Sequence, residues 1–134
     1  MRDRIVCGCL IVLLMLSVTA CSDNVNQLFI KHEKYEVQTS SMKPTFFPGD
    51  IVIFEEVNDP SELRAGDIIL FWTTIDGQRV KHAHRIVEIY QICDSLAFST
   101  KGDNNPMVDA QYVHQKDVLG KFVKIRSTRG RVYG

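Results

Sequence analysis

Apolar residues between positions 28 and 125 come in short runs that alternate with polar residues or are bounded by turn formers. This pattern is typical of β-strands. It predicts strands at 28–37, 51–54, 68–74, 80–90, 92–100 and 118–125. Asp76-Gly77 is a strong signal for a two-residue hairpin turn between the third and fourth of these strands. We therefore expect a mostly β protein, a compact fold of short strands and tight turns.

Two of the predicted strands are introduced by the same dipeptide. Gly49-Asp50 precedes the run that starts at Ile51, and Gly66-Asp67 precedes the run that starts at Ile68. Glycine and aspartate are common turn residues, and each pair is followed by an uninterrupted apolar run. Two copies are too few for a repeat architecture, so we expect two similar turns that lead into buried strands.

The N-terminal segment has a different composition from the rest. No charged residue interrupts the chain from Ile5 to Cys21, a length between that of a signal-peptide core and that of a membrane span. We expect residues 1–21 to be either an N-terminal membrane-anchor helix or a lipoprotein-type signal segment, since Val18-Thr19-Ala20-Cys21 resembles a lipoprotein cleavage box. A linker at 22–34 and a β domain at 35–134 follow. The basic residues before the apolar run place this domain on the extracytoplasmic side.

Charge and cysteine content exclude several classes of function. The chain has 16 basic and 16 acidic side chains, so no basic surplus points to nucleic acid as a partner. Of its four cysteines only Cys93 lies in the β domain, which excludes a disulfide within that domain. No cysteine and histidine spacing suits zinc, and we expect no metal and no other cofactor. Cys93 is expected to be a small, half-buried hydrophobic residue.

The polar bend before Ile51 contains a candidate nucleophile, Ser41. A serine hydroxyl needs an adjacent base, and histidine suits this task near neutral pH. His84 lies on a predicted strand, and Asp103 and Asp109 lie in or beside a Gly-Asp-Asn-Asn loop where either could orient the histidine. His82 is an alternative base, because it lies two residues earlier on the same strand face.

Lys81 and Lys101 are weaker alternatives for the base, as partners in a serine–lysine dyad. Arg85 should point to the opposite face of the strand from His84 and pair with a carboxylate.

Several of these residues form motifs that resemble the signal peptidase I family, and specifically its endoplasmic-reticulum-type branch. The motifs follow the family's order along the chain: Ser40-Ser41-Met42-x-Pro44, Gly66-Asp67-Ile68, His84-Arg85-Ile86-Val87, Lys101-Gly102-Asp103-Asn104-Asn105 and Asp109. The branch is indicated by His84, because the main bacterial branch has a lysine at that position.

The resemblance implies a membrane-bound serine endopeptidase that removes signal peptides from exported preproteins and cleaves after small residues. It makes residues 35–134 the catalytic domain, Ser41 the nucleophile and His84 the general base. It implies Asp109 in preference to Asp103 as the orienting acid, and the Ser41 N–H and the Thr39 hydroxyl as an oxyanion hole. The implied partners are preprotein signal peptides, membrane lipid and accessory subunits. A dedicated processing peptidase for a few secreted proteins, or a non-catalytic lipoprotein with the same fold, would also be compatible with the sequence.

Overall fold

The computed structural model of the protein describes residues 30–126, which contain a single antiparallel sheet. Its strands follow the order β1-β2-β7-β3-β4-β5-β6. Two short 3₁₀ helices, η2 and η3, precede β3 and β7. The strands are β1 (His32–Glu36), β2 (Ile51–Glu56), β3 (Ile68–Ile75), β4 (Gln78–Ile92), β5 (Ser95–Lys101), β6 (Val113–His114) and β7 (Val118–Arg126), and the helices are η2 (Pro60–Glu62) and η3 (Gln115–Asp117).

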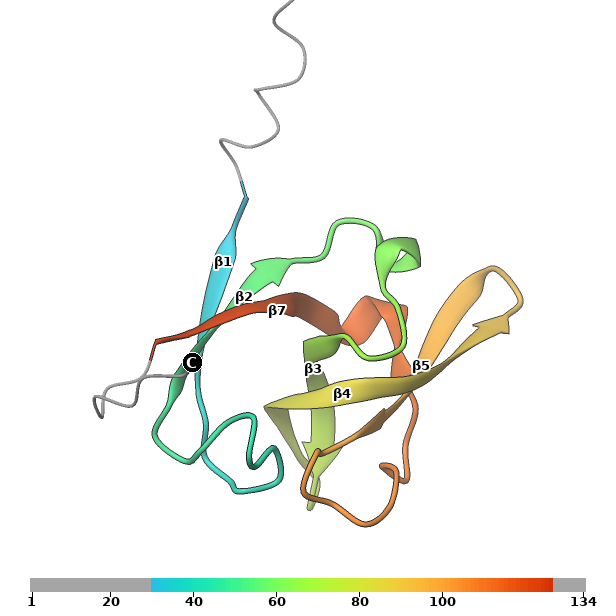
Figure 1. Ribbon diagram of the computed structural model, residues 1–134. Helices are drawn as coiled ribbons and strands as arrows, with labels where there is room; N and C mark the ends of the chain where they lie inside the picture. Colours follow the sequence, from blue (N-terminus) through green and yellow to red (C-terminus); the bar gives the residue numbers. More distant parts are fainter. Residues whose placement is uncertain (1–29, 127–134) are drawn as a thin grey trace, which may run out of the picture. The chain divides into compact units, whose positions relative to one another are not determined.

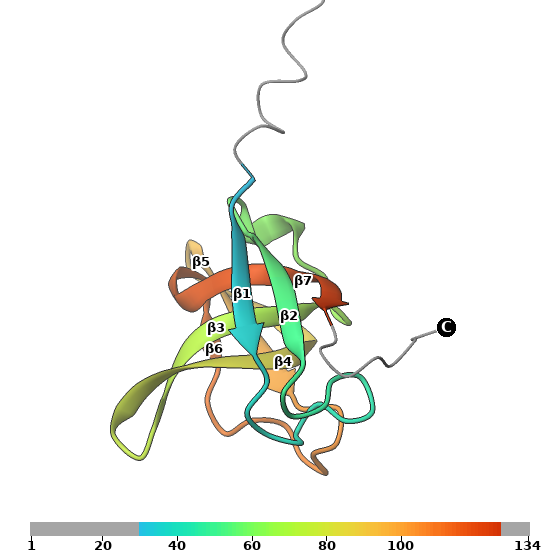
Figure 2. The same ribbon diagram turned by 90° about the vertical axis from the view of Figure 1, so that its left-hand side faces the viewer.

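The sheet is strongly twisted, so its two ends run in different directions. Figures 1 and 2 both show β1 and β2 crossing the direction of β7 and β4. In Figure 2 the β3–β4 hairpin, drawn in yellow-green, extends away from the body of the domain. The loop between β1 and β2 and the loop after β5 lie next to each other at the bottom of both views.

The prediction of a mostly β fold is confirmed, and so is the hairpin at Asp76-Gly77. Both turn residues have positive φ, 50° and 76°, as a type I′ turn requires. The predicted boundary between the fourth and fifth strands is wrong, because β4 continues to Ile92, which pairs with Ser95. Cys93 therefore lies at the tip of a second two-residue turn, with φ 52°, and is exposed rather than half-buried.

The prediction of an N-terminal anchor helix or lipidated Cys21 falls on residues 1–21, outside the described residues. Within residues 30–126 no helix is long and apolar enough to cross a membrane. β1 begins at His32, so the last residues of the predicted linker 22–34 belong to the sheet.

The first half of the central strand β3, residues 68–71, is buried on both faces, which explains its uninterrupted apolar run. Ile68 and Leu70 pack into one hydrophobic cluster, with Val52 and Phe54 among its members. The alternate residues, Ile69 and Phe71, pack into a second cluster with Ile86, Phe98 and others. Because side chains alternate across a strand, β3 ties the two clusters together. Its neighbour β4 is thereby held on a rigid support.

The two Gly-Asp turns share one geometry, as the sequence predicted. Gly49 and Gly66 have φ of 86° and 97°, a conformation that glycine adopts without steric cost. In each turn the aspartate carboxylate accepts a hydrogen bond from the backbone N–H three residues earlier, at 2.9 Å in both. These contacts close the loops that lead into β2 and β3.

Candidate active site

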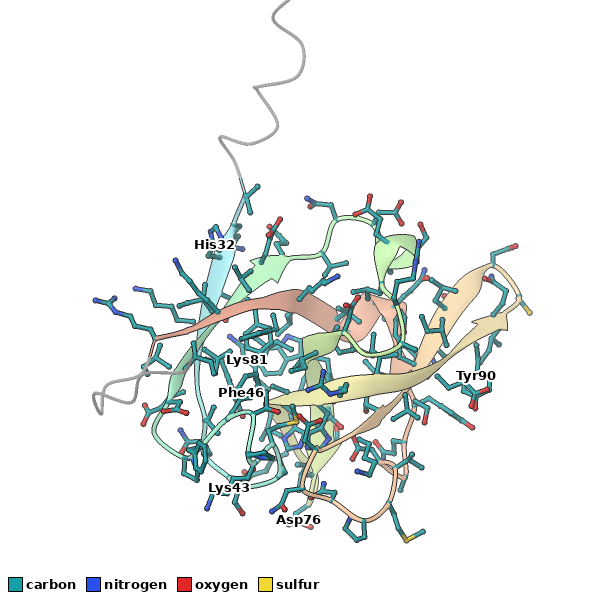
Figure 3. The ribbon with its side chains drawn as sticks, in the orientation of Figure 1. His32, Lys43, Phe46, Asp76, Lys81 and Tyr90 are labelled. Atoms are coloured by element: carbon teal, nitrogen blue, oxygen red, sulfur yellow. The ribbon has the colours of Figure 1, made fainter. Side chains whose placement is uncertain are left out.

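Ser41 lies in the bend between β1 and β2, which is anchored by apolar side chains. Met42 and Phe46 are buried in the first hydrophobic cluster, whereas Ser41 is partly exposed. Figure 3 shows Phe46 inside the domain and Lys43 at the outside of the same bend. The Ser41 carbonyl accepts a hydrogen bond from the backbone N–H of Asn104 at 2.8 Å. The bend is thus fixed both by the core and by the loop after β5.

His84 lies on β4 and faces Ser41. The side chain is almost fully buried, with 2% of the residue exposed. Its Nε2 is 3.1 Å from Ser41 Oγ, and its Nδ1 is 2.6 Å from Asp109 Oδ2. Both distances are within hydrogen-bonding range. The three side chains therefore form a continuous hydrogen-bonded line of hydroxyl, imidazole and carboxylate.

Asp109 is held in place by a second residue, Thr100 at the end of β5. The Thr100 hydroxyl donates to Asp109 Oδ2 at 2.7 Å, and the Asp109 N–H donates to the Thr100 carbonyl at 2.8 Å. Burial acts to raise the pKa of Asp109, but the hydrogen bonds from His84 and Thr100 outweigh it and hold the pKa below its usual value. Asp109 is therefore ionised at neutral pH. Its Oδ2 accepts a hydrogen bond from the protonated Nδ1 of His84.

Asp103 lies elsewhere in the same loop and has different partners. It forms a bidentate ion pair with Arg85, with Nε at 2.8 Å and Nη2 at 2.7 Å, and accepts from the Thr45 hydroxyl. The hydrogen bonds from Arg85 lower its pKa. Within residues 30–126 it has no hydrogen bond to His84. The predicted pairing of Arg85 with a carboxylate is confirmed. Asp103 joins the loop after β5 to β4 through Arg85 and to the bend through Thr45.

Two further side chains contact the line from Ser41 to Asp109. Thr39, exposed on the same bend, has its Oγ1 3.1 Å from Ser41 Oγ. His82 has its Nε2 3.0 Å from His84 Nε2, and burial together with the nearby His84 lowers the pKa of His82. His82 therefore contacts the same nitrogen atom of His84 that faces Ser41.

The two alternative lysines have partners other than Ser41. Lys81 pairs with Glu33 of β1, and Lys101 donates to the Gly102 carbonyl at 3.2 Å. Within the described part of the chain neither has a hydrogen bond to Ser41. This arrangement gives no support to a serine–lysine dyad.

Gly102 is a feature of the site whose role the sequence did not reveal. A Cβ atom at this position would lie 2.6 Å from the Ser41 carbonyl oxygen and 2.9 Å from His84 Nε2. Such distances are too short for real contacts, so only glycine lets β5 end this close to the serine and the histidine. The sequence offers two signals for this position, the glycine itself and its place in the motif Lys101-Gly102-Asp103-Asn104-Asn105.

A cavity of about 270 Å³ opens beside His82 and Asp109. Its walls are the far end of β3 (Phe71 and residues 73–75), His82 and residues 109–111. β3 pairs with β4 along its whole length but with β7 only from Ile69 to Phe71. The strand edge beyond Phe71 therefore borders this cavity.

No group of three or more histidine, cysteine, aspartate or glutamate side chains within residues 30–126 is placed to hold a metal ion. The site consists of hydroxyl, imidazole and carboxylate groups, which act in nucleophilic and acid–base chemistry.

Comparison with known families gives the site its context. The family model described as signal peptidase, peptidase S26, matches residues 7–89. The chain belongs to this family. The matched range contains Ser41 and His84 but ends before Asp103 and Asp109. The resemblance inferred from the short motifs is thereby confirmed.

Curated relatives carry two names, signal peptidase I and catalytic subunit of the signal peptidase complex. Signal peptidase I W of Bacillus subtilis is 31% identical over 113 residues, which cover 84% of this chain and 58% of the relative. The signal peptidase complex catalytic subunit SEC11 of Chaetomium globosum is 31% identical over 94 residues, 65% of this chain and 54% of the relative. SEC11 of Candida albicans is 33% identical over 95 residues, 66% and 55% respectively. The chain spans about half the length of these relatives.

Proposed function

We propose that this signal peptidase family member is a membrane-bound serine endopeptidase that removes signal peptides from exported preproteins. The observation that carries the proposal is the line from Ser41 through His84 to Asp109, with distances of 3.1 and 2.6 Å. The names of the relatives, signal peptidase I and the catalytic subunit of the signal peptidase complex, support the choice of substrate.

In the proposed reaction Ser41 is the nucleophile. Its Oγ attacks the carbonyl carbon of the scissile peptide bond while His84 Nε2 accepts the hydroxyl proton. The tetrahedral intermediate collapses when His84 donates this proton to the leaving amine, which leaves an acyl ester on Ser41. A water molecule then attacks the ester, His84 takes its proton, and Ser41 is regenerated. Because both steps need a neutral His84 at the start, activity should fall in acid.

Asp109 is the orienting acid of this proposal. Its ionised carboxylate keeps the proton of neutral His84 on Nδ1, so that the lone pair on Nε2 faces Ser41. It also stabilises the imidazolium that forms during the reaction. Asp103 supports the loop through Arg85 instead.

The oxyanion of the intermediate needs donors at fixed positions, and we assign this role to the Ser41 N–H and the Thr39 hydroxyl. The Thr39 hydroxyl already contacts Ser41 Oγ at 3.1 Å, so it lies next to the atom that forms the new bond. From there it can donate to an oxygen that develops on the attacked carbon.

The substrate would bind as an extended segment along the edge of β3 beyond Phe71. Backbone hydrogen bonds with such an edge would hold a peptide of almost any sequence, while pockets select its side chains. The cavity between β3 and residues 109–111 lies beside His82 and Asp109 and could receive side chains of such a peptide. The preference for small residues before the cleavage site is what the resemblance to the family implies.

Membrane attachment belongs to the same proposal. An N-terminal anchor or a lipidated Cys21 would hold the domain at the extracytoplasmic surface, where the apolar part of a signal peptide is still in the bilayer. The SEC11 relatives are named as subunits of a complex, which supports accessory subunits for this chain as well. The intact mass of the protein from membranes would distinguish a chain that starts at Met1 from one that starts at a lipidated Cys21.

The proposal is tested with the full chain in detergent and a purified preprotein. Wild type should release a mature product whose N-terminus follows a small residue, and Ser41→Ala should retain only a small residual rate. Ser40→Ala is the matched control, because Ser40 is the adjacent, exposed serine of the same bend. Equal inertness of wild type and Ser41→Ala would overturn the enzyme assignment and leave a non-catalytic protein with this fold. Cleavage confined to one or a few exported proteins would indicate a dedicated processing peptidase.

A further inference from the structure

His82 and His84 are in direct contact through the same ring atom. Their Nε2 atoms are 3.0 Å apart, and their ring centroids are 4.2 Å apart with the planes inclined by 69°. The other side of His82 packs edge-on against Phe71, at 6.0 Å between centroids. The His82 ring is therefore held by β3 and cannot turn away from His84 without losing that contact.

Two nitrogen atoms at this distance attract each other only when one proton lies between them. When His84 is neutral, Asp109 keeps its proton on Nδ1, so the shared proton must come from His82. A His82 N–H then competes with the Ser41 hydroxyl for the single lone pair on His84 Nε2. This contact is a hydrogen bond between two neutral groups.

When His84 has accepted the proton of Ser41, its own Nε2–H becomes the donor. His82 then accepts through the lone pair of its Nε2, in the other neutral tautomer, whose proton is on Nδ1. The partly exposed His82 ring reaches this tautomer by giving up its Nε2 proton to water and taking another on Nδ1, before Ser41 transfers its proton to His84. A hydrogen bond from a charged donor is roughly twice as strong as one between neutral groups. The contact between the two rings is therefore stronger when His84 is protonated than when it is neutral.

The surroundings keep His82 able to act as an acceptor. Burial and the neighbouring His84 lower the pKa of His82, which favours its neutral form at neutral pH. The charged group that faces both rings is Asp109. From β3 they meet apolar side chains, since His84 pairs with Ile69 and His82 with Phe71.

The basic side chains next to the two histidines in sequence point to the other face of β4. Lys81 is bound to Glu33, and Arg85 is bound to Asp103. Neither positive charge is directed at the shared nitrogen atoms.

We propose that His82 is a positioning residue that strengthens His84 as a base, by giving its Nε2 proton a second acceptor beside Ser41. The inference rests on the proposed function for its effect on catalysis, but the contact itself can be tested without substrate. His82 acts through His84 and has no assigned contact with the substrate's reacting atoms.

Two variants separate the hydrogen bond from the packing. His82→Phe keeps a ring against Phe71 but removes the acceptor, and His82→Gln keeps an acceptor oxygen at about the same reach. The full chain has four histidines, so ¹⁵N-histidine labelling gives a simple spectrum. In His82→Phe the ring resonances of His84 should titrate at a pH about one unit lower than in wild type. In His82→Gln most of this difference should disappear.

Catalysis gives a second readout of the same contact. The acid limb of kcat/KM against pH should move with the NMR titration. The kcat of His82→Phe should fall severalfold, by at most about tenfold, because only part of a change in the strength of a general base is expressed in the rate. An unchanged titration of His84 in His82→Phe would overturn the inference, and so would a shift that His82→Gln does not reverse, since packing alone would then explain it.

If the titration shifts as expected but wild type cleaves no preprotein, the inference stands and the proposed function fails. If wild type cleaves and the titration does not shift, the function stands and the inference fails.

Discussion

Replacement of Asp109 by asparagine should abolish most of the activity while leaving the fold intact. Asp109 Oδ2 is 2.6 Å from His84 Nδ1 and 2.7 Å from the Thr100 hydroxyl. An asparagine side chain can still accept from Thr100, but it can also donate to His84 Nδ1 and so favour the wrong tautomer. The same substitution in a serine protease triad lowers kcat by about 10⁴-fold, or about 5 kcal/mol of barrier. We expect a loss of this order, with KM little changed.

Asp103→Asn is the matched control, because it removes the same charge from the same loop. Asp103 binds Arg85 through two hydrogen bonds, and its side chain is 16% exposed against 37% for that of Arg85. Loss of this partly exposed pair should cost about 1–3 kcal/mol of unfolding free energy. For a domain of this size that amounts to a Tm lower by several degrees. The effect on kcat should be small at a temperature where the variant is folded.

The assay is the initial rate of preprotein cleavage at saturating substrate, beside thermal unfolding followed by circular dichroism. The two variants should show opposite profiles, with Asp109→Asn slow and stable and Asp103→Asn active and less stable. The assignment of Asp109 is refuted if its asparagine variant stays within tenfold of wild type, or if Asp103→Asn loses as much kcat as Asp109→Asn does.

Three further predictions address the oxyanion hole, the close approach of Gly102 and the pH dependence of stability. Thr39→Val should lower kcat by about 10²–10³-fold, the loss typical of one oxyanion donor, with KM unchanged. Thr39→Ser, which keeps the hydroxyl, should retain most of the rate. An undiminished kcat in Thr39→Val would exclude Thr39 as an oxyanion donor. Gly102→Ala should lower both activity and stability, the latter by about 1–3 kcal/mol, because the alanine Cβ would lie 2.6 Å from the Ser41 carbonyl oxygen. A normal cleavage rate and a normal Tm would show that the loop has room for this Cβ. The pKa of Asp103 is lowered from 3.8 in the fold, so its contribution to stability is present above about pH 4 and is lost as the pH falls through the lowered value. Unfolding midpoints measured from pH 7 to pH 3 should therefore fall at the acid end, and less steeply in Asp103→Asn; an equal slope in both proteins would contradict this.

The sequence predicts correctly those turns that depend on residues close to one another along the chain. Asp76-Gly77 predicted a hairpin because its residues tolerate positive φ, and the two Gly-Asp turns share a contact between residues three positions apart. The pattern predicts the boundary between β4 and β5 at residue 91, whereas the turn lies at residues 93–94, because cysteine is not a turn former. Pairing between β4 and β5 overrides this weak preference and forces positive φ on Cys93.

The arrangement of the site depended on contacts between distant parts of the chain, which no local pattern encodes. Asp103 and Asp109 are six residues apart in one loop and chemically identical, so only the path of that loop separates their partners, Arg85 and His84. Strand alternation correctly put His82 and His84 on one face. It could not show that their Nε2 atoms meet, or that Gly102 closes against Ser41, because those depend on the twist of the sheet and the packing of the bend.

The central claim is that Ser41, His84 and Asp109 act as one catalytic unit, and a double-variant comparison tests it most directly. Single-turnover cleavage of a preprotein should be measured for Ser41→Ala, His84→Ala and the variant that combines both changes. Groups that act as a unit show strongly non-additive losses. We predict that the combined variant cleaves no more slowly than Ser41→Ala alone. Losses that multiply would show that the two residues act independently and would contradict the proposed mechanism.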